Sequence, residues 1–381
     1  MKLLVFFTCS SFALLPTSAI AQIIPNSNSE PSTLRVSSQG QTVIDGGAIR
    51  GANLFHSFQE FNVEAGQQVY FANPASIQNI FSRVSGSNPS RIFGTLGVLG
   101  NANLFLLNPN GILFGANAQL DIRGSFVAST ANQILLNDGR SLLVSDPNPP
   151  LLTISTPIGL QVNGGSIRVE GKPHQITGET IGLALNTFTY PIEASQTGLK
   201  TQKTLALVGQ NIDFWGGTLA AEPGNLYLTA QSGTIFFQDT ATGLTLAEGT
   251  GQTGNISFRN QASLEVNQQN PGEASTVSIR ANDFLLTDSS LIFTRNASTG
   301  AKVNIQLDGN FTVDGVTQRS IPPAPPPLPR LRRQIRGIVL QGIGDNGTSG
   351  SLNIQAKNIR LQDSAYISLT NRSNLPGESL T

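Results

Sequence analysis

The sequence predicts an all-β protein, a parallel β-helix (solenoid) built from short strands that stack in successive turns. Three observations lead to this prediction: few charged residues, many turn-forming residues, and short strands that recur along the chain. Asp, Glu, Lys and Arg make up 12% of the 381 residues, about half the usual share, whereas the chain has 39 Gly and 21 Pro. Long charged helices and coiled coils need far more Lys, Glu and Ala, so the composition excludes both.

Short alternating strands recur in the second half of the chain. Each reads apolar, polar, apolar, so that two apolar side chains point to the same face. Residues 279–296 also match residues 354–371 without a gap at an offset of 75, which fits three turns of about 25 residues. The strands are 226–228, 256–258, 277–279, 303–305 and 352–354, whose first residues are 30, 21, 26 and 49 apart.

The repeat length favours a β-helix over a propeller, because propeller blades take ~40 to 50 residues. The interval of 49 is one turn plus additional residues, and most of the excess is the Pro- and Arg-rich block 320–336. Proline cannot donate to a strand ladder, so we expect this block to protrude as an extended insertion. Two interpretations of its arginines stay open: contact with an anionic polysaccharide or lipid, and a solvated loop.

Residues 1–21 are predicted to be a secretory signal peptide. Lys2 precedes an apolar run over residues 3–15, and the small residues Ala19 and Ala21 fit cleavage before Gln22. The run is shorter than the ~20 residues that a membrane-spanning helix needs. Cleavage removes Cys9, the only cysteine, so the mature chain is expected to have no disulfide and no cysteine-ligated metal.

The region from residue 34 to about 136 differs from the later repeats, because its turns are richer in Asn and its spacing is less regular. A stacked β-structure needs an atypical terminal unit to cover its first turn. We therefore expect residues 33–49 together with residues 55–63 to form an N-terminal cap, and short β-elements to lie outside the helix.

Two blocks of this region resemble the haemagglutination-activity, or two-partner-secretion, domain of filamentous haemagglutinin-like exoproteins. The residues of these motifs are most similar to those of cyanobacterial members. The first block comprises residues 58–63, 66, 69–74, 77–80 and 83–90, and the second comprises residues 100–115, 118–122 and 124–130. The resemblance implies a right-handed parallel β-helix with a cap. It also implies a division into a secretion domain at 22–250 and β-helix repeats at 251–381.

In function, the resemblance implies a protein secreted through the periplasm of a double-membrane bacterium to the cell surface or the medium. The implied partner is an outer-membrane β-barrel transporter with periplasmic recognition domains. The repeats would then serve as an adhesive surface for glycans, host cells or neighbouring cells. The family's secretion motifs correspond here to Asn73 and Pro74, and to Asn108, Pro109, Asn110, Gly111 and Ile112. The first motif keeps only its first half, because Ala75 and Ser76 follow where the family usually has Asn-Leu.

The same motif residues have a purely structural interpretation. Pro109 has a fixed φ and biases Asn108 to an extended conformation, and Asn110 and Gly111 form a turn pair because both tolerate a positive φ. Stacked asparagines can also form amide ladders between turns. Both interpretations, a corner of the chain and a contact with the transporter, stay open for Asn108 and Asn110.

The remaining chemistry predicts no catalytic site, no metal and no cofactor. Lys and Arg number 23 and so do Asp and Glu, so the chain lacks the basic excess that nucleic acid binding needs. His56 and His174 are 118 residues apart and lack companions for a triad or a metal. The alternative function is a β-helical enzyme acting on polysaccharide, which requires acidic groups on one face. Its candidates are Asp288 and Asp363, which a turn explains, and Asp213 beside Trp215.

Overall fold

A computed structural model describes most of the chain, and every regular element in the described part is a β-strand. The described residues are 23–26, 31–146, 156–174, 177–181, 184–189, 199–201, 203–221, 224–268, 274–315, 331–334, 336–343, 346–371 and 381. The predicted signal peptide and most of the Pro-rich block lie outside these residues. Within the described part, no helix is long and apolar enough to cross a membrane.

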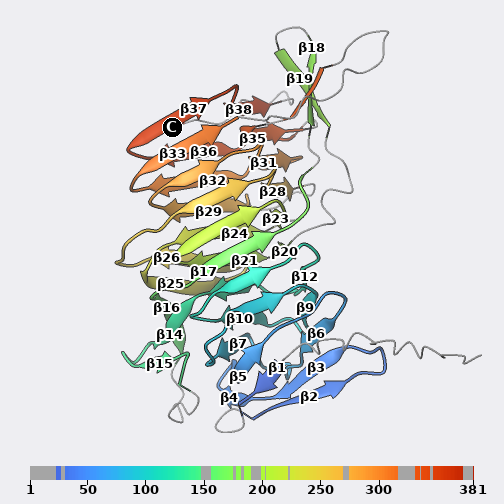
Figure 1. Ribbon diagram of the computed structural model, residues 1–381, viewed down its shortest axis with the longest axis vertical. Helices are drawn as coiled ribbons and strands as arrows, with labels where there is room; N and C mark the ends of the chain where they lie inside the picture. The colour runs from blue at the N-terminus through green and yellow to red at the C-terminus, as the bar shows by residue number, and fades with distance from the viewer. Residues whose placement is uncertain are drawn as a thin grey trace, which may run out of the picture.

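Three stacks of parallel strands wind around one apolar core, as the sequence predicts for a right-handed β-helix (Figure 1). Sheet 1 contains β5 (Asn53–Phe61), β7 (Asn79–Val84), β10 (Asn103–Leu107), β13 (Phe126–Ser129), β21 (Thr204–Gly209), β24 (Asn225–Ala230), β29 (Thr276–Ala281), β32 (Lys302–Leu307) and β36 (Ser351–Gln355). Sheet 2 contains β8 (Ser90–Ile92), β11 (Ile112–Phe114), β17 (Ser166–Glu170), β22 (Asn211–Trp215), β27 (Ile256–Arg259), β30 (Phe284–Leu286), β33 (Asn310–Asp314) and β37 (Asn358–Gln362).

The third face consists of two shorter stacks, which we call sheet 3 together. The first stack contains β6 (Gln68–Phe71), β9 (Thr95–Val98) and β12 (Gln119–Asp121). The second contains β20 (Leu199–Thr201), β23 (Thr218–Ala221), β28 (Ser263–Gln268), β31 (Leu291–Asn296), β35 (Gly337–Gly342) and β38 (Tyr366–Asn371). A complete rung contains one strand from each sheet. The nine sheet 1 strands mark nine rungs in the described residues, and in the first of them an isolated bridge between Val63 and Ile92 takes the place of a sheet 2 strand.

The rungs stack in register, which places like side chains above one another. The inward column of sheet 1 is apolar at every rung, and each member is buried. The column is Leu54, Ile80, Leu104, Phe126, Leu205, Leu226, Val277, Val303 and Leu352. Each rung buries apolar surface against the next rung, and this burial stabilises the fold by roughly 25 cal/mol per Å² of apolar surface removed from water.

The structure corrects two details of the predicted repeat. Of the five alternating strands, the one at 256–258 lies in sheet 2 as part of β27, whereas the other four lie in sheet 1. The offset of 75 spans two rungs and not three, because Ile279 pairs with Ile305, which pairs with Ile354. The second of these steps is long because the chain leaves the helix after β33 and returns at β35.

The cap closes the first rung with four short strands, β1 (Ile23–Pro25), β2 (Ser32–Val36), β3 (Thr42–Gly46) and β4 (Ala48–Arg50). Strands β1 and β4 pair antiparallel with β5 of sheet 1, and β3 pairs with β6 of sheet 3. The cap therefore covers the ends of sheets 1 and 3. The predicted cap at residues 33–49 is therefore correct. Residues 55–63 were wrongly assigned to it, because β5 pairs in parallel with β7 and belongs to the first rung.

A further sheet, the covering sheet, packs on the outer side of sheet 1. Its strands come from excursions out of two different rungs, and β16 pairs antiparallel with β25 to join them. The strands are β14 (Ala131–Leu136), β15 (Ser141–Leu143), β16 (Pro157–Val162), β25 (Gly233–Thr240) and β26 (Gly243–Glu248). Two further excursions, one between β17 and β20 and one between β33 and β35, form an antiparallel sheet of β18 (Thr177–Ile181), β19 (Ala184–Thr189) and β34 (Leu331–Gln334).

The covering sheet creates a second apolar core against sheet 1. Phe55, Phe81 and Phe105 stack there, with ring centroids 5.2 and 4.5 Å apart, and Phe237 of the covering sheet lies 4.9 Å from Phe105. In later rungs the equivalent outward positions are Ser278, Asn304 and Asn353. The outer face of sheet 1 thus turns polar beyond the part that the covering sheet shields.

Arg83 fixes one end of the covering sheet to sheet 1. Its side chain is fully buried at the end of β7, and its Nη1 donates to the carbonyl oxygens of Leu143, Val144 and Asp146 at 3.3, 3.2 and 2.5 Å. Hydrogen bonds from a charged donor to carbonyl oxygens are stronger than neutral ones, so these three bonds offset part of the cost of burying the guanidinium. The arginine therefore ties the segment after β15 to the second rung.

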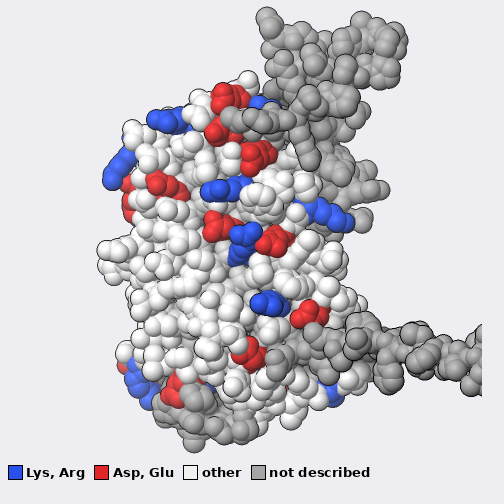
Figure 2. Space-filling model, viewed as in Figure 1, with Lys and Arg blue, Asp and Glu red and all other residues white. Residues whose placement is uncertain are grey.

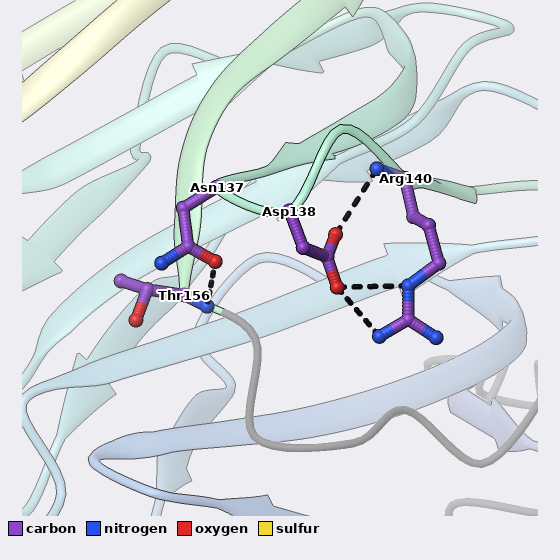
Figure 3. A network of polar contacts seen from close by, with 4 residues as sticks. All are labelled: Asn137, Asp138, Arg140 and Thr156. Atoms are coloured by element: carbon purple, nitrogen blue, oxygen red, sulfur yellow. Dashed lines mark hydrogen bonds and ion pairs between the residues drawn. The ribbon is translucent and has the colours of Figure 1, made fainter.

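A contrasting polar cluster lies at the exposed turn between β14 and β15 (Figure 3). Arg140 donates to Asp138 Oδ2 through Nε at 2.8 Å and Nη2 at 2.6 Å, and Asn137 Oδ1 accepts from the Thr156 backbone at 3.1 Å. The ion pair involves two neighbouring turn residues that are exposed to water, so it contributes little to stability.

The two histidines are buried in separate places and do not form a site together. His56 Nδ1 lies 2.9 Å from Ser32 Oγ of the cap, and His174 Nε2 lies 2.7 Å from the Ser289 carbonyl oxygen. Burial lowers the pKa of His56 and of His174 from the ordinary 6.5 to about 4, and Asp45 opposes the shift at His56 only in part. Both rings are therefore neutral near pH 7, and the Nε2 of His174 carries the proton that it donates to Ser289.

Sheets 1 to 3 continue across residue 250 without interruption, because β22, β23 and β24 pair with β27, β28 and β29. The division of the chain into a secretion domain and repeats at this residue stays a prediction about function.

Replacing Arg83 by Met should destabilise the fold by about 2–4 kcal/mol, because three carbonyl oxygens lose a charged donor while the side chain keeps its length. Arg140→Met in the exposed turn serves as the matched control and should change stability little. Denaturant unfolding followed by circular dichroism measures both, and equal effects of the two substitutions would contradict the role assigned to Arg83.

Acidification should destabilise the protein through its histidines. The folded pKa values lie below the unfolded value of 6.5, so stability is full above about pH 6.5 and declines as the pH falls toward 4. Between pH 7 and pH 5 the expected loss is roughly 2 kcal/mol per histidine. Unfolding curves at the two pH values test this, and His56→Asn and His174→Gln should each show a weaker pH dependence than the wild-type chain.

Candidate functional site: two asparagine-proline corners

The second motif forms the corner between β10 and β11 in the third rung, which we call the Asn108 corner (residues 108–111). The backbone of Asn108 continues the sheet 1 ladder by donating to the Ser129 carbonyl at 3.0 Å. Its carbonyl then accepts from the Gly111 backbone at 3.1 Å, which closes a four-residue turn. The predicted turn is therefore confirmed.

Asn108 is the centre of this corner and is fully buried. Its Nδ2 donates to the Asn88 carbonyl oxygen and to Ser90 Oγ, both at 3.0 Å, and these residues form the corner of the rung below. Its Oδ1 accepts from the Asn110 backbone N–H at 3.0 Å. All the hydrogen-bonding groups of the amide are engaged within the protein, and none faces solvent.

Asn110 lies on the surface of the same corner. Its Nδ2 donates to the Gly86 carbonyl at 2.7 Å and to Asn108 Oδ1 at 3.1 Å. The expected positive φ occurs only at Gly111, at +119°, and not at Asn110. A side chain at Gly111 would also come within 3.0 Å of the Ser166 carbonyl of the next rung, so glycine is required here. Ile112 follows as a buried member of sheet 2.

The first motif lies at a different corner, between β6 and β7, which we call the Asn73 corner (residues 72–78). Asn73 Nδ2 donates to the Pro74 carbonyl at 3.1 Å, and the same carbonyl accepts from the Ile77 backbone at 3.0 Å. Asn73 Oδ1 is buried without a hydrogen-bond partner, against Gly100 of the next rung, where a Cβ would lie only 2.7 Å away. Pro74, Ala75 and Ser76 are exposed.

The structure does not bring the two motifs together. The Asn73 corner leads into a strand of sheet 1 and the Asn108 corner leads out of one, so they lie on opposite edges of that sheet. A strand of five or six residues separates these edges by roughly 17 Å. A single partner that binds both corners therefore has to span the width of sheet 1.

Amide ladders exist, but at other positions than the motifs. Asn79 donates to Asn53 at 3.0 Å, Asn103 donates to Asn79 at 2.9 Å, and Asn103 Oδ1 accepts from the Ser125 backbone at 2.8 Å. These residues begin successive strands of sheet 1. A similar ladder begins the strands of sheet 2 and comprises Asn211, Asn255, Asp283, Asn310 and Asn358. The sequence signal for both ladders was an Asn, or in one case Asp283, at the start of each apolar strand.

The remaining candidates form no catalytic cluster in the described residues. Asp288 and Asp363 have φ values of +53° at equivalent turns, as their turn interpretation predicts. Asp213 accepts from Ser257 Oγ at 2.6 Å on the outer face of sheet 2. No group of three or more His, Cys, Asp or Glu suited to a metal occurs in the described part of the chain. Charged side chains on the face in Figure 2 are sparse, and many lie beside one of opposite sign.

A capped parallel β-helix with this pair of corners is the arrangement that the sequence motifs imply for a secretion domain. Residues 21–316 match the family model of the TPS secretion domain, where TPS denotes two-partner secretion. Because the match spans more than half of the chain, the chain belongs to this family, as its resemblance to haemagglutinin-like exoproteins predicts. The protein is thus a two-partner-secretion exoprotein domain.

Two solved structures are similar to this chain. The HMW1 secretion domain from Haemophilus influenzae is 16% identical with a TM-score of 0.45, and the match covers 92% of this chain and 83% of that one. The filamentous hemagglutinin secretion domain is 14% identical with a TM-score of 0.40, covering 90% of this chain and 98% of that one. No curated protein matches the sequence significantly.

Asn108→Ala should destabilise the protein by about 2–4 kcal/mol, because it leaves several buried polar groups without partners. Asn110→Ala should cost only about 1 kcal/mol, because water can replace its exposed hydrogen bonds. Denaturant unfolding of the two variants measures the difference. Equal costs would contradict the division of the corner into a buried and an exposed asparagine.

Proposed function

We propose that this domain is recognised by an outer-membrane β-barrel transporter with periplasmic recognition domains, which exports the chain to the cell surface or the medium. Membership of the TPS secretion domain family supports the proposal most directly. The pathway requires the chain to pass through the periplasm, in agreement with the signal peptide predicted at residues 1–21.

We further propose that the buried motif residues at the two corners support folding, whereas the exposed ones contact the transporter. Asn108, Gly111 and Ile112 are buried and shape the corner, so their contribution to secretion is through folding. Asn110 and Pro74 are exposed at opposite edges of sheet 1 and are the residues that a transporter can contact in the folded domain. Pro109 is half-buried beside Asn110, and Asn73 orients the chain at its own corner.

Outside the cell, the proposed role is an adhesive surface directed at glycans or at host or neighbouring cells. The surface of the stacked sheets offers many exposed polar side chains, which suits hydrogen bonding to the hydroxyl groups of glycans. The enzyme alternative has no specific support, because Asp288 and Asp363 lie at turns and Asp213 accepts a hydrogen bond from Ser257 Oγ at 2.6 Å.

Export of the full chain with its own signal peptide tests the transporter proposal. The chain is expressed in a double-membrane host with and without a cognate barrel, and medium and periplasm are assayed separately. Asn110→Ala should lower transporter-dependent release several-fold while the purified protein keeps its circular dichroism spectrum. Release that does not depend on any barrel tried would overturn the proposal.

Asn310→Ala is the matched control for this experiment. Asn310 is also exposed and bridges two rungs, with its Nδ2 donating to Asp283 and its Oδ1 accepting from Asn358, each at 2.9 Å. Its loss should therefore cost similar stability without affecting export. If both substitutions reduce release equally, Asn110 acts through folding and not through recognition.

A further inference from the structure

The outer face of sheet 2 carries a small grid of polar and aromatic side chains over the fourth, fifth and sixth rungs. Strands β17, β22 and β27 pair in register there, so their outward residues form two rows with neighbours ~4.8 Å apart. One row contains Arg168, Asp213 and Ser257, and the other contains Glu170, Trp215 and Arg259.

Trp215 is the centre of the second row and is 49% exposed. An indole that large is normally buried, because leaving it in water forfeits its hydrophobic stabilisation. The chain turns directly after it at Gly216 and Gly217, which have φ values of +67° and +80° and carry no side chain that could cover the ring. The structure therefore holds a flat aromatic surface open to solvent on a rigid sheet.

Of the charged side chains around the indole, Arg168, Glu170 and Asp213 have polar partners, whereas Arg259 has no ion-pair partner among the described residues. Arg168 Nε contacts Glu170 Oε1 at 2.7 Å, and Asp213 accepts from Ser257 at 2.6 Å. Arg259, beside Trp215 on the next strand, has no carboxylate within ion-pairing distance in the described part of the chain. Its guanidinium is exposed and can donate two parallel hydrogen bonds to the carboxylate of a ligand.

A small hollow continues the grid at the corner between sheets 2 and 3. Glu170, Gly171, Lys172 and Gly217 contribute to its lining, so one acidic and one further basic side chain lie at its edge. The segment that forms this edge is held in place, because the His174 backbone donates to Gln261 at 3.0 Å and its ring donates to Ser289. The grid and the hollow form one rigid surface.

We propose that this surface binds an acidic polysaccharide, with a sugar ring stacked on Trp215 and the carboxylate of a uronic acid unit held by Arg259. Sugars present apolar C–H faces that pack on an exposed indole, and their hydroxyls suit the paired acids and bases of the two rows. A nucleic acid would need a larger basic patch, and a protein partner would need a broader apolar core. The ligand class rests on the adhesive role proposed above, whereas export does not depend on it.

Binding is tested on the purified full-length mature chain with oligogalacturonate as the probe. Trp215 is the only tryptophan in the sequence, so intrinsic fluorescence reports this site alone. The proposal predicts a saturable change in emission. Calorimetry should show at least tenfold weaker binding for Trp215→Ala and for Arg259→Gln, and weaker binding of the methyl-esterified oligomer, which keeps the rings but lacks the charge.

Two exposed residues elsewhere provide matched controls. Phe236→Ala removes an exposed aromatic ring from the covering sheet, and Arg360→Gln removes an exposed arginine from β37 of the same sheet 2. Neither should alter affinity, and circular dichroism confirms that each variant folds. The proposal is overturned by the absence of saturable binding, by unchanged affinity in the Trp215 and Arg259 variants, or by equal affinity for the esterified oligomer. These outcomes leave the export experiment unaffected.

Discussion

Parallel in-register pairing of the strands governs where the side chains of this protein lie. A parallel ladder places each side chain directly over its counterpart one rung away, so an inward column that lines the core stays apolar from rung to rung. The column from Leu54 to Leu352 meets this condition with Leu, Ile, Val and Phe alone. His56 is a polar member of the neighbouring inward column, and its ring lies 2.9 Å from the hydroxyl of Ser32 in the cap. Because a slip of one residue would turn an apolar column outward, the corners between strands have to fix the register at each rung.

The corners fix the register with hydrogen bonds that cross rungs. Asn108 reaches down to Asn88 and Ser90, and the Asn53, Asn79 and Asn103 ladder joins the beginnings of three consecutive strands. An amide has both donors and acceptors, so it can accept from one rung and donate to the next, which a carboxylate cannot do. The motif at residues 108–112 is thus a structural corner, in which Asn108 is buried and Asn110 is exposed.

Stacking alone does not account for the covered side of sheet 1. There the outward positions are apolar in the early rungs, and strands from two distant excursions meet to bury them. The buried Arg83 holds one end of this covering sheet by donating to three carbonyl oxygens. The later rungs extend beyond the covering sheet and carry Ser278 and Asn304 at the same outward positions. The outer face of sheet 1 is therefore apolar and covered in the early rungs, and polar in the later ones. The exposed Trp215 belongs to yet another surface, on sheet 2.

Local signals in the sequence, namely alternation, turn residues and the position of proline, predict the β-helix, the cap at residues 33–49 and the corner at Asn108. The same signals misplaced the strand at 256–258 and indicated three rungs where two occur, since equal spacing along the chain does not reveal which sheet a strand joins. Three features could be known only from the folded chain: β16 pairs with β25, Asn108 is buried while Asn110 is exposed, and Trp215 lies beside Arg259. These pairings join residues many positions apart, and which distant strands become neighbours depends on the excursions between rungs, whose lengths follow no period.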